Sequence, residues 1–321
     1  YLGARYERID TGFRVVDIYQ QTPAAEGVMR LHVGDVITHI DFSPLADSDT
    51  INARLVGRVN RETAVTVLRS PEHLPPQRVD ENPENEGDID PDAPREVVLL
   101  ITPISSAQLD NIRYDNWQLA NKARVDEWSD GQLGYIHIRS MNGTSLADFE
   151  RDLYAACEGK LGMVVDVRDN GGGWTTDRLL ASIMTRRHAY TVPRGADPTR
   201  TNSYPNDRLF IARYNLPMNA LCNEKSFSNA EIFSHAFKTL ERGTLVGNTT
   251  AGGVISTGSY SLLDGTTVRI PFRGWYLTDG TDMENNGAVP DLMVVQTPEH
   301  EEAGEDPQLQ AAVEDLLGRI E

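Results

Sequence analysis

The sequence predicts two domains of different class, a β-rich module over residues 1–105 and an α/β domain over residues 131–321. In the first part, short apolar runs are separated by turn residues, as is typical of a small β-rich module. In the second, strand-like and helix-like segments alternate, which indicates an α/β layer. Helical spacing of apolar residues over 106–130 predicts a helical connector between them. At 321 residues, the chain is long enough for each domain to bury its own core.

In the β-rich module, "FRVVDIY", "GDVITHI", "AVTVLR" and "REVVLLI" read as strands. The stretch "TPAAEGVMRLHVGDVITHIDFSPL" predicts a short helix before a Val-Gly-Asp turn, where glycine allows positive φ and the aspartate binds nearby amides. Residues 77–96 are rich in acidic residues, proline and glycine, so we expect a mobile loop there and assign it no role.

The stretch "TPAAEGVMRLHVGDVITHIDFSPL" resembles the PDZ family, and the resemblance covers about the first 105 residues. "YLGA" at the start of the chain is similar to the carboxylate-binding loop of that family. The resemblance implies that Leu2, Gly3 and Ala4 present backbone amides to a peptide C-terminus. The alternative is that Leu2 and Gly3 are an ordinary strand entry.

In the α/β domain, "LGYIHIRSM" precedes an amphipathic segment from Leu146 to Cys157. The nearly continuous apolar run "LGMVVDVR" then predicts a strand that is buried on both faces. "RLFIARYN" and "TLVGNTTAGG" continue the alternation. "DPQLQAAVEDLLGRIE" predicts a closing helix with Asp306 as its N-cap.

The net charge of −18 and the isoelectric point near 4.8 disfavour nucleic acid and anionic membranes as partners, because both would be repelled. Cys157 and Cys222 predict buried free thiols, and we predict no metal and no cofactor. No apolar run approaches the length that spans a bilayer. The chain starts without methionine, and we expect it to be part of a longer polypeptide located in the cytoplasm, with a secreted or periplasmic form as the alternative.

Two segments of the α/β domain could carry chemistry. Gly171, Gly172 and Gly173 lie between a buried strand and a helix, where backbone amides can converge on an anion, although a simple tight turn is the alternative. The Gly-Lys-Ser/Thr of a phosphate loop is absent, which disfavours nucleotide binding. Ser228 and Glu231 match a capping box, yet a serine after a sharp turn at the positive end of a helix also suits a nucleophile.

Five segments, "GYIHIRSM", "VVDVRDNGGG", "CNEKSFSNAEIFSHAFK", "GNTTAGG" and "ENNGAVPD", occur in an order and spacing that resemble the tail-specific (C-terminal-processing) serine peptidases, most closely their tricorn branch. The resemblance covers essentially the whole chain and implies a crotonase-like α/β core. It implies that Ser228 is the nucleophile, that the Gly173 and Asn229 amides form the oxyanion hole, and that Glu284 orients the base.

The base itself is not evident. Most tail-specific peptidases have a lysine on the strand that reads "GNTTAGGVISTG" here, where this chain has Gly252 and Gly253. Lys238 lies about 15 Å along the helix from Ser228, which is too far for a dyad. The tricorn branch uses a histidine before the PDZ module. We therefore expect the base upstream of this chain, and little or no activity from the chain alone.

None of the histidines within the chain is a convincing substitute for that base. In its strand, His137 is expected to be packed, and His235 lies two helical turns from Ser228, about 10 Å away. The remaining five have no partner that suggests catalysis.

The resemblance also bears on substrate and assembly. The tricorn pattern has an acidic residue that suits a basic side chain where this sequence has Thr191, so that preference does not carry over. The overall acidity still favours cationic peptides. The tricorn resemblance implies a large closed homo-oligomer, a hexamer, that admits peptides.

The leading hypothesis is a serine peptidase that works through an acyl-enzyme. One alternative is a non-catalytic peptide-binding scaffold in which the PDZ module works and the peptidase core has decayed. Another is acyl-thioester hydrolysis, which uses the same oxyanion geometry.

Overall fold

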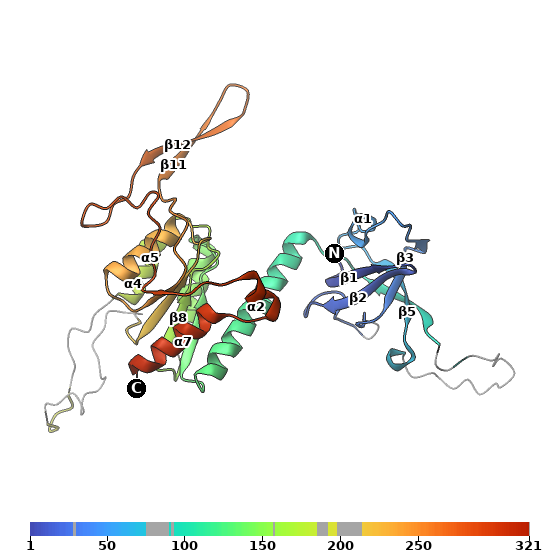
Figure 1. The fold of residues 1–321 in the computed structure, drawn as a ribbon, viewed down its shortest axis with the longest axis horizontal. Coiled ribbons are helices and arrows are strands. Elements are labelled where there is room, and N and C mark those ends of the chain that lie inside the picture. The colour runs from blue at the N-terminus through green and yellow to red at the C-terminus, as the bar shows by residue number, and fades with distance from the viewer. Residues whose placement is uncertain are drawn as a thin grey trace. The chain divides into compact units, whose positions relative to one another are not determined.

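The structure, a computed structural model, describes residues 1–27, 30–74, 90, 93–156, 158–184, 192–197 and 214–320. The chain divides into two compact units, unit 1 (Tyr1–Leu119) and unit 2 (Ala120–Glu321), and each has its own hydrophobic core (Figure 1). Among the described residues, no helix combines the length and apolar character that a membrane crossing requires.

Unit 1 is built on an antiparallel sheet with the strand order β1-β2-β3-β5-β6. The strands are β1 (Ala4–Ile9), β2 (Gly12–Ile18), β3 (Val36–Ile40), β4 (Ser43–Pro44), which pairs with β3, β5 (Thr63–Arg69) and β6 (Arg95–Ile101). Among the described residues, unit 1 also contains the short helix α1 (Ile51–Arg54), the 3-10 helix η1 (Pro71–His73) and the first part of α2 (Ser106–Trp128). β1 lies at one edge of the sheet.

The Val-Gly-Asp turn before β3 is confirmed. Gly34 has φ +97°, and the Asp35 carboxylate accepts a hydrogen bond from His32 N–H at 2.9 Å. The short helix expected before this turn is wrong for the described residues of that stretch. There Ala24 N–H donates to the Leu2 carbonyl at 2.9 Å, so long-range bonding replaces the helical pattern.

Most of the acidic segment at 77–96 lies outside the described residues, but its end differs from the prediction. Arg95 and Glu96 already belong to β6, where they pair with Arg69 and Leu68 of β5. The predicted loop is therefore too long by two residues, because the charges of a surface strand resemble those of a loop.

Unit 2 contains a parallel five-stranded sheet with the order β13-β10-β9-β8-β7. The strands are β7 (Leu133–His137), β8 (Gly162–Asp166), β9 (Met218–Cys222), β10 (Leu245–Gly247) and β13 (Leu292–Met293). One face is covered by α3 (Gly143–Ala155), α4 (Thr176–Ile183) and α5 (Asn229–Thr239). The other face is covered by α7 (Pro307–Ile320) and the end of α2 (Ser106–Trp128), as Figure 1 shows; α6 (Pro298–Ala303) precedes α7.

Strand β8 is buried on both faces, as predicted. Met163 and Val165 pack with the cluster under α3, α4 and α5, whereas Val164 packs with the cluster under α7. The N-cap of the closing helix is also confirmed, since the Asp306 carboxylate accepts a hydrogen bond from Leu309 N–H at 2.9 Å.

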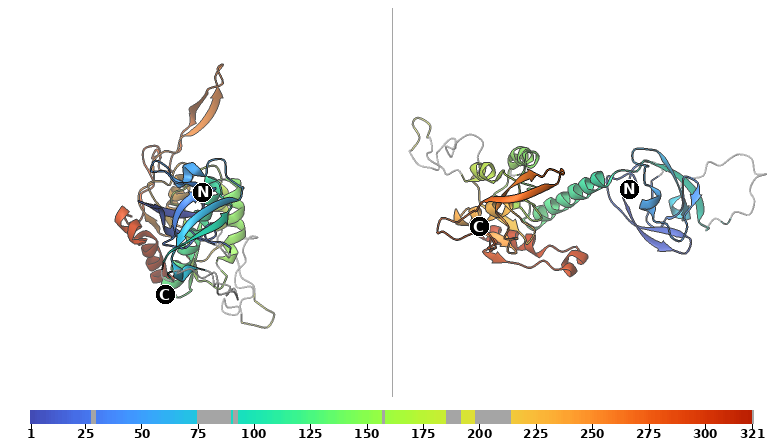
Figure 2. Two further views of the ribbon diagram at one scale, coloured as in Figure 1. Left: turned by 90° about the vertical axis from the view of Figure 1, so that its right-hand side faces the viewer. Right: turned by 90° about the horizontal axis from the view of Figure 1, so that it is seen from above.

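A separate β-hairpin extends from unit 2, formed by β11 (Ser256–Ser261) and β12 (Thr267–Arg273) (Figures 1 and 2). Tyr260 is paired with Val268 and Gly258 with Ile270, so alternation gathers the apolar side chains on one face. These large side chains are exposed.

A buried ion cluster joins the end of β8 to the start of α7. The Arg168 guanidinium donates to Asp166 at 2.7 Å and to Asp306 at 2.8 and 2.9 Å, and Tyr135 O–H donates to Asp166 at 2.9 Å. Burial by itself would raise the pKa of the Asp166 carboxyl, but Arg168 holds that pKa below its usual range. The cluster thereby fixes the chain immediately before the triple-glycine turn.

We expect His137 to make the stability of unit 2 depend on pH. It is buried in β7 and its Nε2–H donates to the Arg168 carbonyl at 2.9 Å; burial lowers the pKa of this imidazole. Below the ordinary histidine pKa of about 6.5, the unfolded chain binds a proton that the folded chain excludes. The free energy of unfolding should therefore decrease as the pH is lowered below about 6.5, by at most about 1.4 kcal/mol per pH unit for this group.

Urea unfolding between about pH 7.5 and about pH 5 measures this slope. His137→Gln should flatten it, whereas His39→Gln, in unit 1, should leave the slope of unit 2 unchanged. An unaltered slope in His137→Gln would contradict the assignment.

Candidate active site

The triple-glycine turn and the turn before Ser228 come together at the carboxyl edge of the unit 2 sheet. β8 and β9 are parallel neighbours, so the segments that follow them start at the same edge. Phe227 N–H donates to the Asn170 carbonyl at 2.9 Å, and the Ser226 hydroxyl donates to the Val167 carbonyl at 2.8 Å. These bonds hold the turn before Ser228 against the triple-glycine turn.

Ser228 occupies a backbone conformation that is rare for a residue with a side chain. Its φ is +56° and its ψ is −117°, and α5 begins at the next residue. Such a conformation costs about 1–3 kcal/mol and persists only where the surroundings enforce it. The serine therefore stands at the positive end of a helix on a sharp, strained turn.

The predicted capping box of Ser228 and Glu231 is present. Its side-chain hydrogen bond comes from the glutamate and not from the serine hydroxyl. Glu231 Oε1 accepts a hydrogen bond from Ser228 N–H at 2.9 Å. Within the described part of the chain, Ser228 makes no side-chain capping hydrogen bond, and Glu231 N–H donates to the Ser228 backbone carbonyl at 2.9 Å. The hydroxyl is thus not used as an ordinary N-cap.

The triple-glycine turn lies directly against the serine. A Cβ atom on Gly172 would lie 2.7 Å from Ser228 Cβ and 2.9 Å from the Asn229 nitrogen, and one on Gly173 would lie 1.9 Å from the Met141 carbonyl oxygen. Both glycines have positive φ, +88° and +147°. Only glycine fits this approach.

Two amides at this junction are free. Among the described residues, neither Gly173 N–H nor Asn229 N–H donates to a protein acceptor. Asn229 itself is held in place, because its side-chain oxygen accepts from Thr176 N–H at 2.9 Å and its carbonyl accepts from the Thr176 hydroxyl at 2.6 Å. Two unsatisfied donors beside a serine can stabilise a developing oxyanion.

Glu284 is half-buried and bound by backbone on one side. Its Oε2 accepts hydrogen bonds from Val254 N–H at 2.9 Å and from Ile255 N–H at 3.0 Å. No described residue donates to its other oxygen. A carboxylate held in this way can orient an incoming donor with its free oxygen.

The segment 248–255 that carries these amides differs from the sequence expectation. A continuous strand was expected over "GNTTAGGVISTG", but β10 ends at Gly247 and β11 begins at Ser256. Of the intervening amides, the four of residues 252–255 bind side-chain carboxylates in place of a neighbouring strand.

The sequence missed the importance of Glu231, which showed there only as a capping residue. Glu231 is fully buried, and its carboxylate also accepts from the Thr250 hydroxyl at 2.7 Å and from the amides of Gly252 and Gly253. The three-residue spacing between Ser228 and Glu231 in the sequence indicated only the capping box. Nothing in the sequence indicated the partners of Glu231 at Thr250, Gly252 and Gly253.

Within the described part of the chain, no histidine or lysine forms a hydrogen bond with Ser228. His235 Nε2–H donates to the Asn286 carbonyl at 3.1 Å, and Lys238 Nζ is bound by Asp291 at 3.0 Å and by the Val289 carbonyl at 2.9 Å. His137 is occupied by Arg168. His32 stacks on His73, His39 bonds Thr38, His300 bonds Thr297, and His188 lies outside the described residues.

Three of the other predicted residues belong to unit 1. Leu2 is buried in the core of unit 1, Gly3 has φ +95° against Thr22, and Ala4 starts β1. Thr191 and Cys157 lie outside the described residues. Cys222 is a buried free thiol, and burial raises its pKa to about 12.

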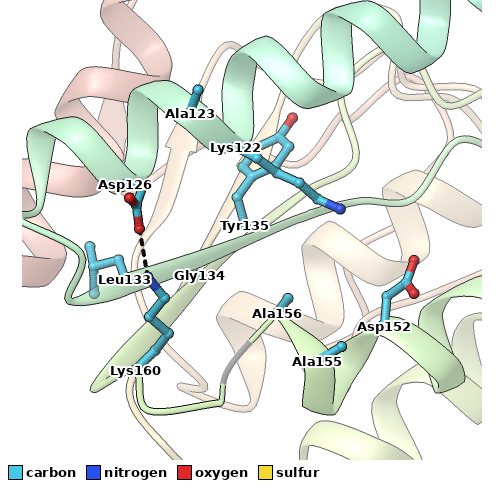
Figure 3. A pocket seen from close by; sticks show the side chains of 10 residues that line it. All are labelled: Lys122, Ala123, Asp126, Leu133, Gly134, Tyr135, Asp152, Ala155, Ala156 and Lys160. Carbon is cyan, nitrogen blue, oxygen red and sulfur yellow. Dashed lines mark hydrogen bonds and ion pairs between the residues drawn. The ribbon is translucent and has the colours of Figure 1, made fainter.

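A pocket of about 430 Å³ in unit 2 does not belong to the site. It lies between α2, the start of β7 and the end of α3, with Lys160 reaching Asp126 at 2.6 Å (Figure 3). Ser228 follows the carboxyl end of β9, whereas this pocket is lined by residues at the amino end of the parallel strand β7. The pocket and Ser228 therefore lie at opposite edges of the sheet.

Comparison with known proteins decides the family. The model for peptidase family S41 matches residues 132–294, just over half of the chain, and this span includes every residue of the junction described above. The chain belongs to peptidase family S41. This S41 chain is 32% identical over 307 residues to "Tricorn protease" of Thermoplasma volcanium, covering 94% of this chain and 26% of that protein.

A second relative, "Tricorn protease homolog 1" of Streptomyces coelicolor, is 38% identical over 224 residues, which cover 69% of this chain and 20% of that protein. Among solved structures, "Crystal structure of the tricorn protease" matches with a TM-score of 0.75 and 25% identity, covering all of this chain and 29% of the other. The S41 chain thus spans about a quarter or less of the length of these curated relatives.

Proposed function

We propose that this S41 chain carries the nucleophile of a tricorn-like serine peptidase, a hydrolase that cleaves peptides through an acyl-enzyme. Ser228 is the nucleophile, the amides of Gly173 and Asn229 form the oxyanion hole, and Glu284 orients the base. The main support is the strained Ser228 backbone at the start of α5, directly beside two free amides. Family membership supports the same assignment.

In the first half of the reaction, Ser228 Oγ attacks the peptide carbonyl carbon and its proton passes to the base. The carbonyl oxygen becomes an oxyanion, which accepts hydrogen bonds from the Gly173 and Asn229 amides. The C–N bond then breaks and the base returns the proton to the leaving amine. Water attacks the resulting ester, and the same groups release the acid and restore Ser228.

We infer that the base is a histidine in a segment upstream of this chain. The described histidines and Lys238 are bound to other groups, while Glu284 keeps one oxygen free for a partner. The relatives extend well beyond the matched region, which leaves room for such a segment. The chain alone should therefore turn over peptides weakly or not at all.

For unit 1 we propose a PDZ-type role, with unit 2 as a crotonase-like core. Support comes from β1, which pairs only with β2 among the described strands and so offers an edge to an extended peptide. We also propose assembly into a closed homo-oligomer, a hexamer, by likeness to the tricorn proteins. Analytical ultracentrifugation of the whole protein tests that assembly.

Hydrolysis of a mixed fluorogenic peptide library tests the function. The whole protein and this 321-residue chain are compared in parallel. Cleavage by the whole protein alone is expected, because the base lies upstream. Cleavage by the chain as well would place the base among its own residues. If neither cleaves, the peptide-binding scaffold is favoured over the peptidase.

A further inference from the structure

Glu231 is a fully buried carboxylate that is solvated entirely by neutral donors. Its Oε1 accepts from Ser228 N–H at 2.9 Å and from Gly253 N–H at 2.8 Å. Its Oε2 accepts from the Thr250 hydroxyl at 2.7 Å and from Gly252 N–H. Among the described residues no lysine, arginine or histidine forms an ion pair with it. A buried charge is tolerated only where such donors replace water.

The donors come from one short segment that also binds the second carboxylate of the site. The amides of Gly252 and Gly253 go to Glu231, and the next two amides, of Val254 and Ile255, go to Glu284. Four consecutive N–H groups are therefore divided between the two carboxylates. The position of Glu284 is tied to that of Glu231 through this stretch of backbone.

The bond from Ser228 N–H explains how the strained turn is held. The conformation of Ser228 is unfavourable in isolation, so the folded protein must supply bonds that exist only in that conformation. Oε1 of Glu231 is shared by Ser228 and Gly253, which joins the nucleophile to the glutamate-binding segment through one atom.

We propose that Glu231 is a positioning residue of the peptidase site, which fixes the backbone of Ser228 and sets the place of Glu284 relative to it. This inference rests on the proposed function for its effect on turnover. Glu231 does not touch substrate; it acts through Ser228 and through Gly252–Ile255. Four donors point at this side chain, so an acceptor-only group suits the site, whereas a glutamine would turn two donor hydrogens toward them.

Glu231→Gln is the direct test in the whole protein. We expect kcat for peptide hydrolysis to fall about 10- to 100-fold, the range for losing a hydrogen bond to a charged group, with KM within about threefold of wild type. Labelling of Ser228 by a fluorophosphonate should slow in parallel. Hydrogen exchange, followed by mass spectrometry, should speed up at the amides of Ser228, Gly252 and Gly253.

Val313→Ala in α7 is the matched control, because Val313 is buried in the cluster on the opposite face of the sheet. It should lower the melting temperature while keeping kcat. If Glu231→Gln keeps kcat within about twofold of wild type, the proposal is wrong. It is equally wrong if the control loses kcat as much as Glu231→Gln does, because that would make the effect one of general stability.

Two further results separate this inference from the function beneath it. If wild type neither cleaves peptides nor labels at Ser228, the proposed function fails, while the exchange experiment still reports whether Glu231 holds the turn. If Glu231→Gln does not fold, Glu231→Asp replaces it: the charge is kept but the shorter side chain cannot reach both Ser228 and Gly253. A wild-type kcat and unchanged exchange in that variant would overturn the positioning role.

Discussion

Ser228→Ala in the whole protein is expected to lower kcat/KM for peptides by about 10⁴- to 10⁶-fold, the range found when a serine nucleophile is removed. The hydroxyl makes no capping hydrogen bond, so its loss should leave the fold intact. KM should change little, because substrate contacts are retained. The measurement is steady-state hydrolysis of a fluorogenic peptide, with thermal unfolding as a check on folding.

Ser234→Ala is the matched control for this substitution. Ser234 lies on the same helix, is fully buried and donates only to the Ala230 carbonyl at 2.9 Å. Its variant should keep wild-type kcat/KM. Comparable losses in both variants, or an active Ser228→Ala protein, would contradict the assignment of the nucleophile.

Arg168→Met is expected to have the largest effect on stability. Arg168, Asp166 and Asp306 are all buried, and the substitution leaves the two carboxylates without their cation. Breaking a buried pair in this way costs about 3–5 kcal/mol in the free energy of unfolding. Urea unfolding measures it, and a loss below about 1 kcal/mol would show that the cluster contributes little.

A further variant distinguishes unpaired charge from lost side-chain packing as the reason for the instability of Arg168→Met. Adding Asp166→Asn and Asp306→Asn to Arg168→Met removes the unpaired charges and should recover much of the lost stability, since asparagine can also cap α7. Arg151→Met removes an exposed arginine that pairs with Asp148 and Asp152, and it should change stability little. If Arg168→Met and the triple variant are equally unstable, packing and not charge explains the loss.

Local patterns predicted much of unit 2. The apolar run of β8 gave a strand buried on both faces because neighbours on each face bury a parallel strand. Asp306 was found as an N-cap because capping depends on residues within three positions. The junction of Gly173 and Ser228 was expected from a family resemblance, which encodes a long-range contact that no local pattern shows.

Long-range polar contacts could not be predicted. Arg168 and Asp306 are 138 positions apart, and nothing near either residue indicates the other. The partners of Glu231 lie in a segment expected to be a strand, in which amides pair with a neighbouring strand and not with a carboxylate. The helix expected before the turn at Gly34 failed for a similar reason, as Ala24 bonds to Leu2, which lies 22 positions earlier in the chain.

Covalent labelling of the nucleophile tests most directly the central claim that Ser228 attacks the peptide. The whole protein is treated with a fluorophosphonate and digested, and the modified residue is identified by mass spectrometry. We predict one adduct on the peptide that contains Ser228, with none on that peptide in Ser228→Ala. An adduct on a different residue that is needed for turnover, or full peptide turnover by protein whose Ser228 is modified, would contradict the account.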